Sequence, residues 1–322
     1  MNNQNEAEKK ALEQLDQEFN ESNAKEIQEN VKSLGKIQRP DYTKEDVEEV
    51  NRKFGWHQIY PEHLPTSGLY YDTSITIKIK AATTNEIMFF STVDDTDPLS
   101  ANEAIIDLLK ICCKVSFGNK QGSWKDLKDE DKVFVILSIR DLTFAEGENK
   151  LSFTVNCPSC NTPNEMIISN ENFQKRTLHE KLQKYYNEST RQLEIESKVG
   201  NFTLCPPNLG IMKIVEDYIL KIKKEGKDIK KEMPFLSVLP YMIKDWRGFT
   251  LDKITNLKHE FLSWDRKKFE LFSKLAELFK VGVEEEMKTH CTSCEEVIEA
   301  KFKLPNGVKG LFAENDILDE LL

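Results

Sequence analysis

Two Cys-x-x-Cys pairs constrain this chain of 322 residues more than any other feature of its sequence. The first pair is Cys157 and Cys160, and the second is Cys291 and Cys294. A Cys-x-x-Cys turn aims two sulfurs at one point, so two such turns supply the four thiolates that a tetrahedral Zn²⁺ ion takes. Alternating apolar residues flank both pairs, which is typical of the strands of a zinc ribbon. We therefore predict a structural zinc site with these four ligands and no open coordination position for water.

The distance between the two pairs along the chain predicts that the ribbon is split. Subtracting 160 from 291 gives 131 residues, whereas contiguous four-cysteine sites leave about 15 to 20 residues between their pairs. A separate segment must therefore be inserted between the two halves. One ion bound by both pairs would hold the start of that insertion against its end, and its binding would contribute roughly 10 kcal/mol to folding.

Other uses of the cysteines stay open. A redox pair is one, although thioredoxin-type chemistry uses a single pair at a helix N-terminus. Disulfides are another, but they need an oxidising compartment, and the N-terminal sequence lacks the charged and apolar segments of a secretion signal. We expect Cys112, Cys113 and Cys205 to be buried as small apolar side chains. His290 is expected beside the site or exposed, because four thiolates already complete a ligand set.

Apolar periodicity predicts the elements around the cysteines. Ile75, Ile77 and Ile79 alternate with polar residues, which indicates a half-buried strand. A helix is predicted from a capping box at Ser100 through Cys112, and another over Val133–Leu137. A hairpin is predicted around the first cysteine pair, and a strand from Val297 after the second. From Phe173 the chain is predicted to be largely helical, with apolar stripes over 211–222, 251–262 and 269–279.

These patterns predict an α+β fold: a small sheet with packed helices, a split four-cysteine zinc ribbon, and a mainly helical insertion between its two knuckles. The first residues are polar with few apolar positions, which indicates marginal helices near 12–34 and a short helix from Thr43. The predicted parts are a helical or partly disordered N-terminal arm (1–55), an α+β domain (56–150), the ribbon (151–172 and 283–305), the insertion (173–282) and a C-terminal tail helix (306–322).

Composition narrows the classes of function. Acidic residues number 55 and basic residues 45, which gives a net charge of −10 and disfavours a nucleic-acid or anionic-membrane binder. Mean hydropathy is −0.54, and no stretch of about 18 apolar residues predicts a membrane span. Phosphate-binding glycine loops, zinc-protease motifs and nucleophile elbows are absent from the sequence, so we expect a protein that is not an enzyme.

The order of the motifs resembles a known family. The segments Leu64–Tyr71, Ile75–Lys80, Leu127–Lys132 and Ile136–Arg140, followed by Cys-Pro-Ser-Cys at 157–160 and Cys-Thr-Ser-Cys at 291–294, are similar to the baseplate hub subunit and hub-assembly proteins of T4-like contractile-tailed bacteriophages. The resemblance covers roughly residues 60 to 305, including the insertion between the knuckles. Asn161 and Glu295 depart from the family, which commonly has glycine after each knuckle.

The resemblance implies a non-enzymatic structural component of a phage tail baseplate hub, in the virion tail and, during assembly, in the host cytoplasm. Its partners would be other baseplate or hub proteins, with the N-terminal arm docking on a neighbouring subunit. One alternative is a transient hub-assembly chaperone that the virion does not retain. A second is a nucleic-acid-binding zinc ribbon, which predicts basic and aromatic strands, whereas the ribbon loops here carry Glu165, Glu295 and Glu296.

Overall fold

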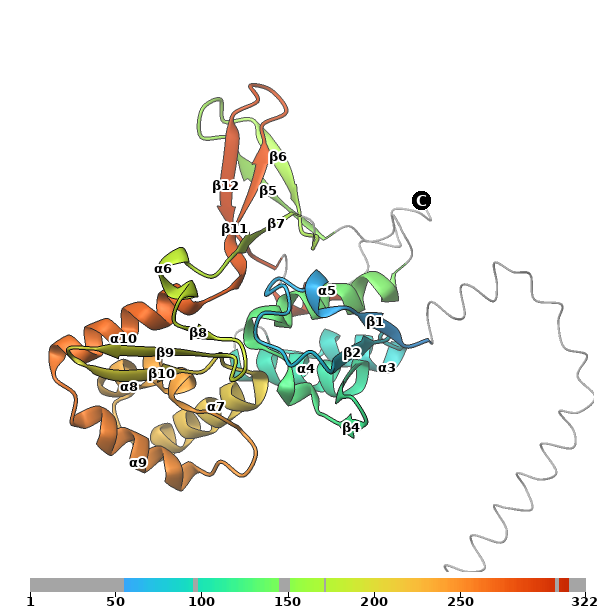
Figure 1. Ribbon diagram of the computed structural model, residues 1–322. Helices are drawn as coiled ribbons and strands as arrows, with labels where there is room; N and C mark the ends of the chain where they lie inside the picture. The colour runs from blue at the N-terminus through green and yellow to red at the C-terminus, as the bar shows by residue number, and fades with distance from the viewer. Residues whose placement is uncertain (1–54, 95–97, 145–150, 171, 305–306, 313–322) are drawn as a thin grey trace, which may run out of the picture. The chain divides into compact units, whose positions relative to one another are not determined.

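The protein is described by a computed structural model, in which residues 55–94, 98–144, 151–170, 172–304 and 307–312 are placed (Figure 1). The chain divides into two units, residues 1–49 and 50–322, and every element below belongs to the second. The predicted α+β class is confirmed, with small antiparallel sheets, packed helices and a split four-cysteine ribbon. The helices predicted near 12–34, from Thr43 and within the tail lie outside the described residues. The domain boundaries stay predictions.

The first sheet holds four antiparallel strands in the order β1-β2-β3-β4. They are β1 (His57–Ile59), β2 (Ile75–Ile79), β3 (Cys113–Phe117) and β4 (Lys120–Gln121). The alternation predicted for β2 is confirmed, because Ile75, Ile77 and Ile79 are buried while Lys78 is exposed. Side chains of a strand alternate between its faces, so β2 gives one face to the core and the other to solvent.

Three helices share a hydrophobic core with this sheet: α3 (Thr84–Ser91), α4 (Pro98–Cys112) and α5 (Lys132–Thr143). The predicted helix ending at Cys112 is confirmed as α4, but α4 begins at Pro98, so Ser100 lies inside its first turn and does not cap it. The helix predicted over Val133–Leu137 is confirmed as part of α5. Cys113 is buried as predicted, although it opens β3 and does not continue the helix.

Short 3-10 turns connect these elements: η1 (Pro61–His63), η2 (Trp124–Asp126), η3 (Asp129–Asp131) and η4 (Val308–Leu311). The fully buried Asp131 carboxylate ends η3. It accepts hydrogen bonds from the Thr66 N–H (3.0 Å), the Thr66 hydroxyl (2.8 Å) and the Tyr71 hydroxyl (2.8 Å), and the Tyr71 oxygen accepts from the Lys128 N–H (2.9 Å). We call these four residues the Asp131 network. It joins two of the segments on which the family resemblance rests, 64–71 and 127–132.

Two β-hairpins carry the cysteine pairs (Figure 1). The first consists of β5 (Ser152–Asn156) and β6 (Pro163–Ile167), and the second of β11 (Gly282–His290) and β12 (Val297–Lys301). The strand β7 (Phe173–Arg176) pairs with the other edge of β11, which gives a three-stranded sheet in the order β12-β11-β7. The hairpin predicted around the first pair and the strand predicted from Val297 are both confirmed.

The base of the second hairpin lies directly against η3. β11 begins at Gly282, whose φ of 149° is a conformation that favours glycine. A Cβ atom at this position would lie 2.8 Å from the Cβ of Glu130 and 3.2 Å from its carbonyl oxygen. Glycine therefore lets the backbone of β11 lie directly against η3, the turn that carries Asp131.

Mostly strands occupy the first part of the insertion, 173–204. Besides β7 these are β8 (Tyr186–Asn187), β9 (Gln192–Ser197) and β10 (Gly200–Leu204), with the single-turn helix α6 (Glu180–Gln183) among them. The prediction that the chain is largely helical from Phe173 is therefore wrong over 173–204. Leu193 and Ile195 alternate with charged residues, and Phe202 and Leu204 follow the same two-residue period, so the pattern is that of strands with one buried face.

Helices make up the rest of the insertion: α7 (Leu209–Lys224), α8 (Ile229–Met242), α9 (Leu251–Leu262) and α10 (Arg266–Phe279). The three predicted apolar stripes are confirmed as α7, α9 and α10. The helix α8, which contains Pro234 and Pro240, was not among the predicted elements. Proline removes a backbone donor and usually ends or kinks a helix, so these residues masked its pattern.

The ribbon shares a hydrophobic core with the first sheet and its helices. Two clusters of buried side chains fill most of the insertion, and a third contains the first sheet, its helices and the buried side chains along both hairpins. Cys157 and Cys291 belong to this third cluster, as do Met166, Met287 and Ile298 from the hairpin strands. One cysteine of each pair therefore lies against the apolar core.

Candidate metal centre

The first cysteine pair lies in the turn between β5 and β6. The Cys157 N–H donates to the Thr162 carbonyl (2.9 Å), and the Asn161 N–H donates to the Cys157 carbonyl (2.9 Å). Asn161 has a φ of 59°, a left-handed conformation that asparagine adopts more readily than most residues other than glycine. This backbone arrangement brings Cys160 back beside Cys157.

The second pair repeats the same arrangement between β11 and β12. The Cys291 N–H donates to the Glu296 carbonyl (2.8 Å), and the Glu295 N–H donates to the Cys291 carbonyl (3.0 Å). Glu295 has a φ of 62°, which matches Asn161 at the equivalent position after the first pair. The two positions at which the sequence departs from glycine therefore both adopt the conformation that glycine favours.

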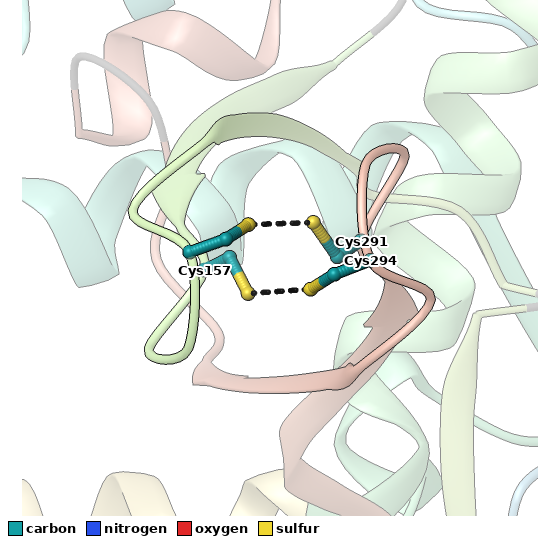
Figure 2. A group of neighbouring side chains, drawn as sticks. Cys157, Cys291 and Cys294 are labelled. Atoms are coloured by element: carbon teal, nitrogen blue, oxygen red, sulfur yellow. Dashed lines mark hydrogen bonds between the residues drawn. The ribbon is translucent and has the colours of Figure 1, made fainter.

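The two turns face each other and bring the four sulfurs together. The Cys157 and Cys294 sulfurs lie 3.6 Å apart, and the Cys160 and Cys291 sulfurs 3.5 Å apart. All four sulfurs lie within 4.8 Å of one another, and Figure 2 shows the side chains of Cys157, Cys291 and Cys294 pointing into the space between the two turns. Four sulfurs at 2.3 Å from a tetrahedral ion would be about 3.8 Å apart, so the observed separations suit such an ion. They far exceed the roughly 2.05 Å of a disulfide bond.

The site is buried on one side and open on the other. Cys157 and Cys291 are buried, whereas Cys160 and Cys294 are exposed. The arrangement offers four sulfur ligands and could hold one metal ion, which would link strands 131 residues apart in sequence.

The Cys291 sulfur also receives backbone hydrogen bonds. The Ser293 N–H donates to it at 3.4 Å. Together with the Cys294 N–H, this donor lowers the pKa of the Cys291 thiol to about 6, because hydrogen bonds to a thiolate favour the charged form. A thiolate is the form that binds a metal ion, so the backbone of the turn prepares this ligand for binding.

Asn164 is a contributor to the site that the sequence analysis missed. It is buried on β6, and its amide oxygen accepts from the N–H (2.8 Å) and the hydroxyl (3.0 Å) of Thr292 in the opposite turn. Its amide nitrogen donates to the Thr162 carbonyl (2.8 Å) and lies 3.6 Å from the Cys291 sulfur. One side chain thus bonds to both turns and to one sulfur. A partner 128 residues away gives no local pattern, so only its position beside the first knuckle could have drawn attention to it.

The other predicted cysteine and histidine positions lie apart from this cluster. Cys112, Cys113 and Cys205 are buried, as predicted. Burial raises the pKa of Cys205 to about 11 and that of Cys113 to about 12, so these thiols stay protonated at neutral pH. His290 is exposed, and its ring nitrogen lies 3.4 Å from the Glu295 carbonyl, which agrees with the prediction of a residue beside the site.

Comparison of the chain with protein-family models, with curated proteins and with solved structures gave no match. Among the described residues, no helix combines the length and apolar character needed to cross a membrane.

Proposed function

We propose that the four cysteines bind one structural Zn²⁺ ion. The support is the set of four sulfurs from two matching turns, spaced as a tetrahedral ion requires and flanked by a buried amide that holds the turns together. Four thiolates fill the coordination shell of zinc, which leaves no position for a reacting water. The role of the ion would be to fix the two hairpins to each other, and so to fix both ends of the insertion.

We further propose that the protein is a non-enzymatic structural component of a phage tail baseplate hub. Its location would be the tail of the virion, and its partners other baseplate or hub proteins. The observation that carries this proposal is that two of the segments behind the family resemblance meet in space. Thr66 and Tyr71 from the segment 64–71 bond to Asp131 from the segment 127–132 at 2.8 to 3.0 Å. Buried contacts of this kind give the segments a reason to occur together.

Purified tails and virions test the assignment. Quantitative mass spectrometry should detect this chain in mature particles at a fixed ratio to the other baseplate proteins. Its presence in assembly intermediates but not in mature particles would favour the transient assembly chaperone instead. Its absence from both would contradict either form of the proposal. Elemental analysis of the purified chain should give one zinc per molecule, and this result is independent of where the protein acts.

A further inference from the structure

A groove between α3 and α4 leaves apolar side chains open to solvent. It has a volume of about 290 Å³. Phe90 and Leu108 are buried and line it, while Phe89 and Ile111 also line it with 48% and 43% of their surface exposed. Large apolar side chains gathered at one exposed groove are typical of a surface that another apolar segment covers.

Lysines continue this groove toward β3. Lys110 lines both the groove and a neighbouring depression of about 590 Å³, which no acidic residue lines. Of the two carboxylates in the groove, Glu86 accepts from the Thr83 N–H and Asp107 pairs with Lys110. An apolar groove beside a basic strip suits a segment that is both apolar and acidic. The lysines of this strip are Lys78, Lys110, Lys114 and Lys120.

The described part of the chain ends beside this groove. The Phe312 ring packs on the ring of Phe90, with 4.9 Å between their centroids, and Phe90 lines the groove. The residue before Phe312 is also held in place, because Arg140 donates a hydrogen bond to the Leu311 carbonyl. Ten residues, 313–322, follow in the sequence. They span about 15 Å as a helix and up to about 33 Å when extended, so they can reach Phe89 and Ile111.

The sequence of these ten residues complements the surface. In a helix, Ile317, Leu318, Leu321 and Leu322 would fall on one side, together with Glu314, and Asp316, Asp319 and Glu320 on the other side. The segment contains no lysine or arginine. Its apolar side therefore matches the groove, and its charge matches the lysine strip.

We propose that residues 313–322 dock in the α3–α4 groove of their own chain. Their leucines cover Phe89 and Ile111, and their carboxylates lie toward Lys110 and Lys114. This inference depends on neither the metal ion nor the phage assignment.

Site-specific photocrosslinking in the full chain tests the docking. Ile111→benzoylphenylalanine should crosslink to residues 313–322 at the mass of a single chain, because a side chain at 111 faces the docked segment. Leu262→benzoylphenylalanine is the matched control, since Leu262 is a 65% exposed apolar residue on α9. It should give no crosslink to the same segment. Circular dichroism should show that both variants are folded.

Charge exchange makes the test specific. Lys114→Glu should lower the crosslinking yield at position 111 by about five-fold, and adding Asp319→Lys with Glu320→Lys should restore most of it. Leu318→Asp with Leu321→Asp should abolish the crosslink. A crosslink found only at twice the chain mass would place the segment on a second copy and overturn docking within one chain. Equal yields at 111 and 262, or no crosslink to 313–322, would overturn the proposal altogether.

Discussion

The sulfur cluster and the Asp131 network do the same structural task with different chemistry. Each joins segments distant in sequence, 131 residues apart between Cys160 and Cys291, and 65 between Thr66 and Asp131. The Asp131 network is complete as it stands, because one carboxylate accepts three hydrogen bonds from the protein. The sulfur cluster gathers four groups that all prefer to bind a common ion. We therefore expect the Asp131 network to be sensitive to mutation and pH, and the sulfur cluster to be sensitive to the removal of metal.

The largest expected effect is metal removal. Chelation should lower the protection of the ribbon strands, 152–167 and 282–301, against hydrogen exchange by about 1,000-fold or more, because the binding free energy of a structural zinc is on the order of 10 kcal/mol. Strand β2 and helix α5 should stay protected, since the Asp131 network does not use the ion. Hydrogen exchange monitored by mass spectrometry measures both. A uniform loss of protection, or none, would contradict this separation.

Cys291→Ser should have the same effect without a chelator. Serine cannot replace a thiolate ligand of zinc, so the purified variant should retain less than about a tenth of the wild-type metal. Cys205→Ser is the control, because Cys205 is a buried thiol outside the cluster. It should keep one metal ion per chain even where it lowers stability. Equal metal loss in both variants would mean that the cluster is not the binding site.

Asp131→Ala should reduce stability next most strongly, by about 3 kcal/mol in urea unfolding. It leaves the Thr66 N–H and hydroxyl and the Tyr71 hydroxyl without their shared acceptor in the core. Asp129→Ala changes the same turn η3, but Asp129 is only partly buried, bonding to Lys132, so this control should cost less than about 1 kcal/mol. The metal content of both variants should equal that of the wild type.

The pH dependence of the Asp131 network has a definite sign. Burial raises the pKa of Asp131 to about 6 in the folded protein, above the roughly 4 of an unfolded aspartate. The folded state therefore holds this proton more tightly, and its stabilising effect is present below about pH 4 and lost as the pH rises through 6. Relative to Asp131→Asn, the wild type should lose about 2–3 kcal/mol between pH 4 and pH 7. Urea unfolding of the wild type and of Asp131→Asn at both pH values measures this change. A wild-type stability that rose with pH relative to the variant would contradict the raised pKa of Asp131.

The smallest effect is expected at Asn164. Asn164→Asp removes the donor to the Thr162 carbonyl and adds negative charge beside the Cys291 sulfur, so metal affinity should fall about 10- to 100-fold. Asn172→Asp is the matched control, because Asn172 is exposed and bonds to the Ile167 carbonyl at the far end of the same hairpin. Competition with a chromogenic chelator measures both affinities. Equal affinities would show that Asn164 does not support the site.

The comparison also shows which features can be predicted from sequence. The sulfur cluster could be predicted, because cysteine pairs are rare and their spacing has few uses. The strand β2 and helix α5 could be predicted from apolar periodicity alone. Asn164 and Asp131 could not, because asparagine and aspartate are common at the surface and their partners lie 128 and 65 residues away. The strands β8 to β10 are short, with two to six residues each, and α8 contains two prolines, so neither was predicted from the local pattern.

The split ribbon has a consequence for synthesis on the ribosome. The first hairpin leaves the ribosome with its two sulfurs, but their counterparts at 291 and 294 are not yet made. At about 5–20 residues per second, 131 further residues take roughly 7 to 26 seconds. During that interval the insertion can fold while its two ends are still unconnected. The final arrangement of this protein is therefore closed late, once the second cysteine pair has emerged.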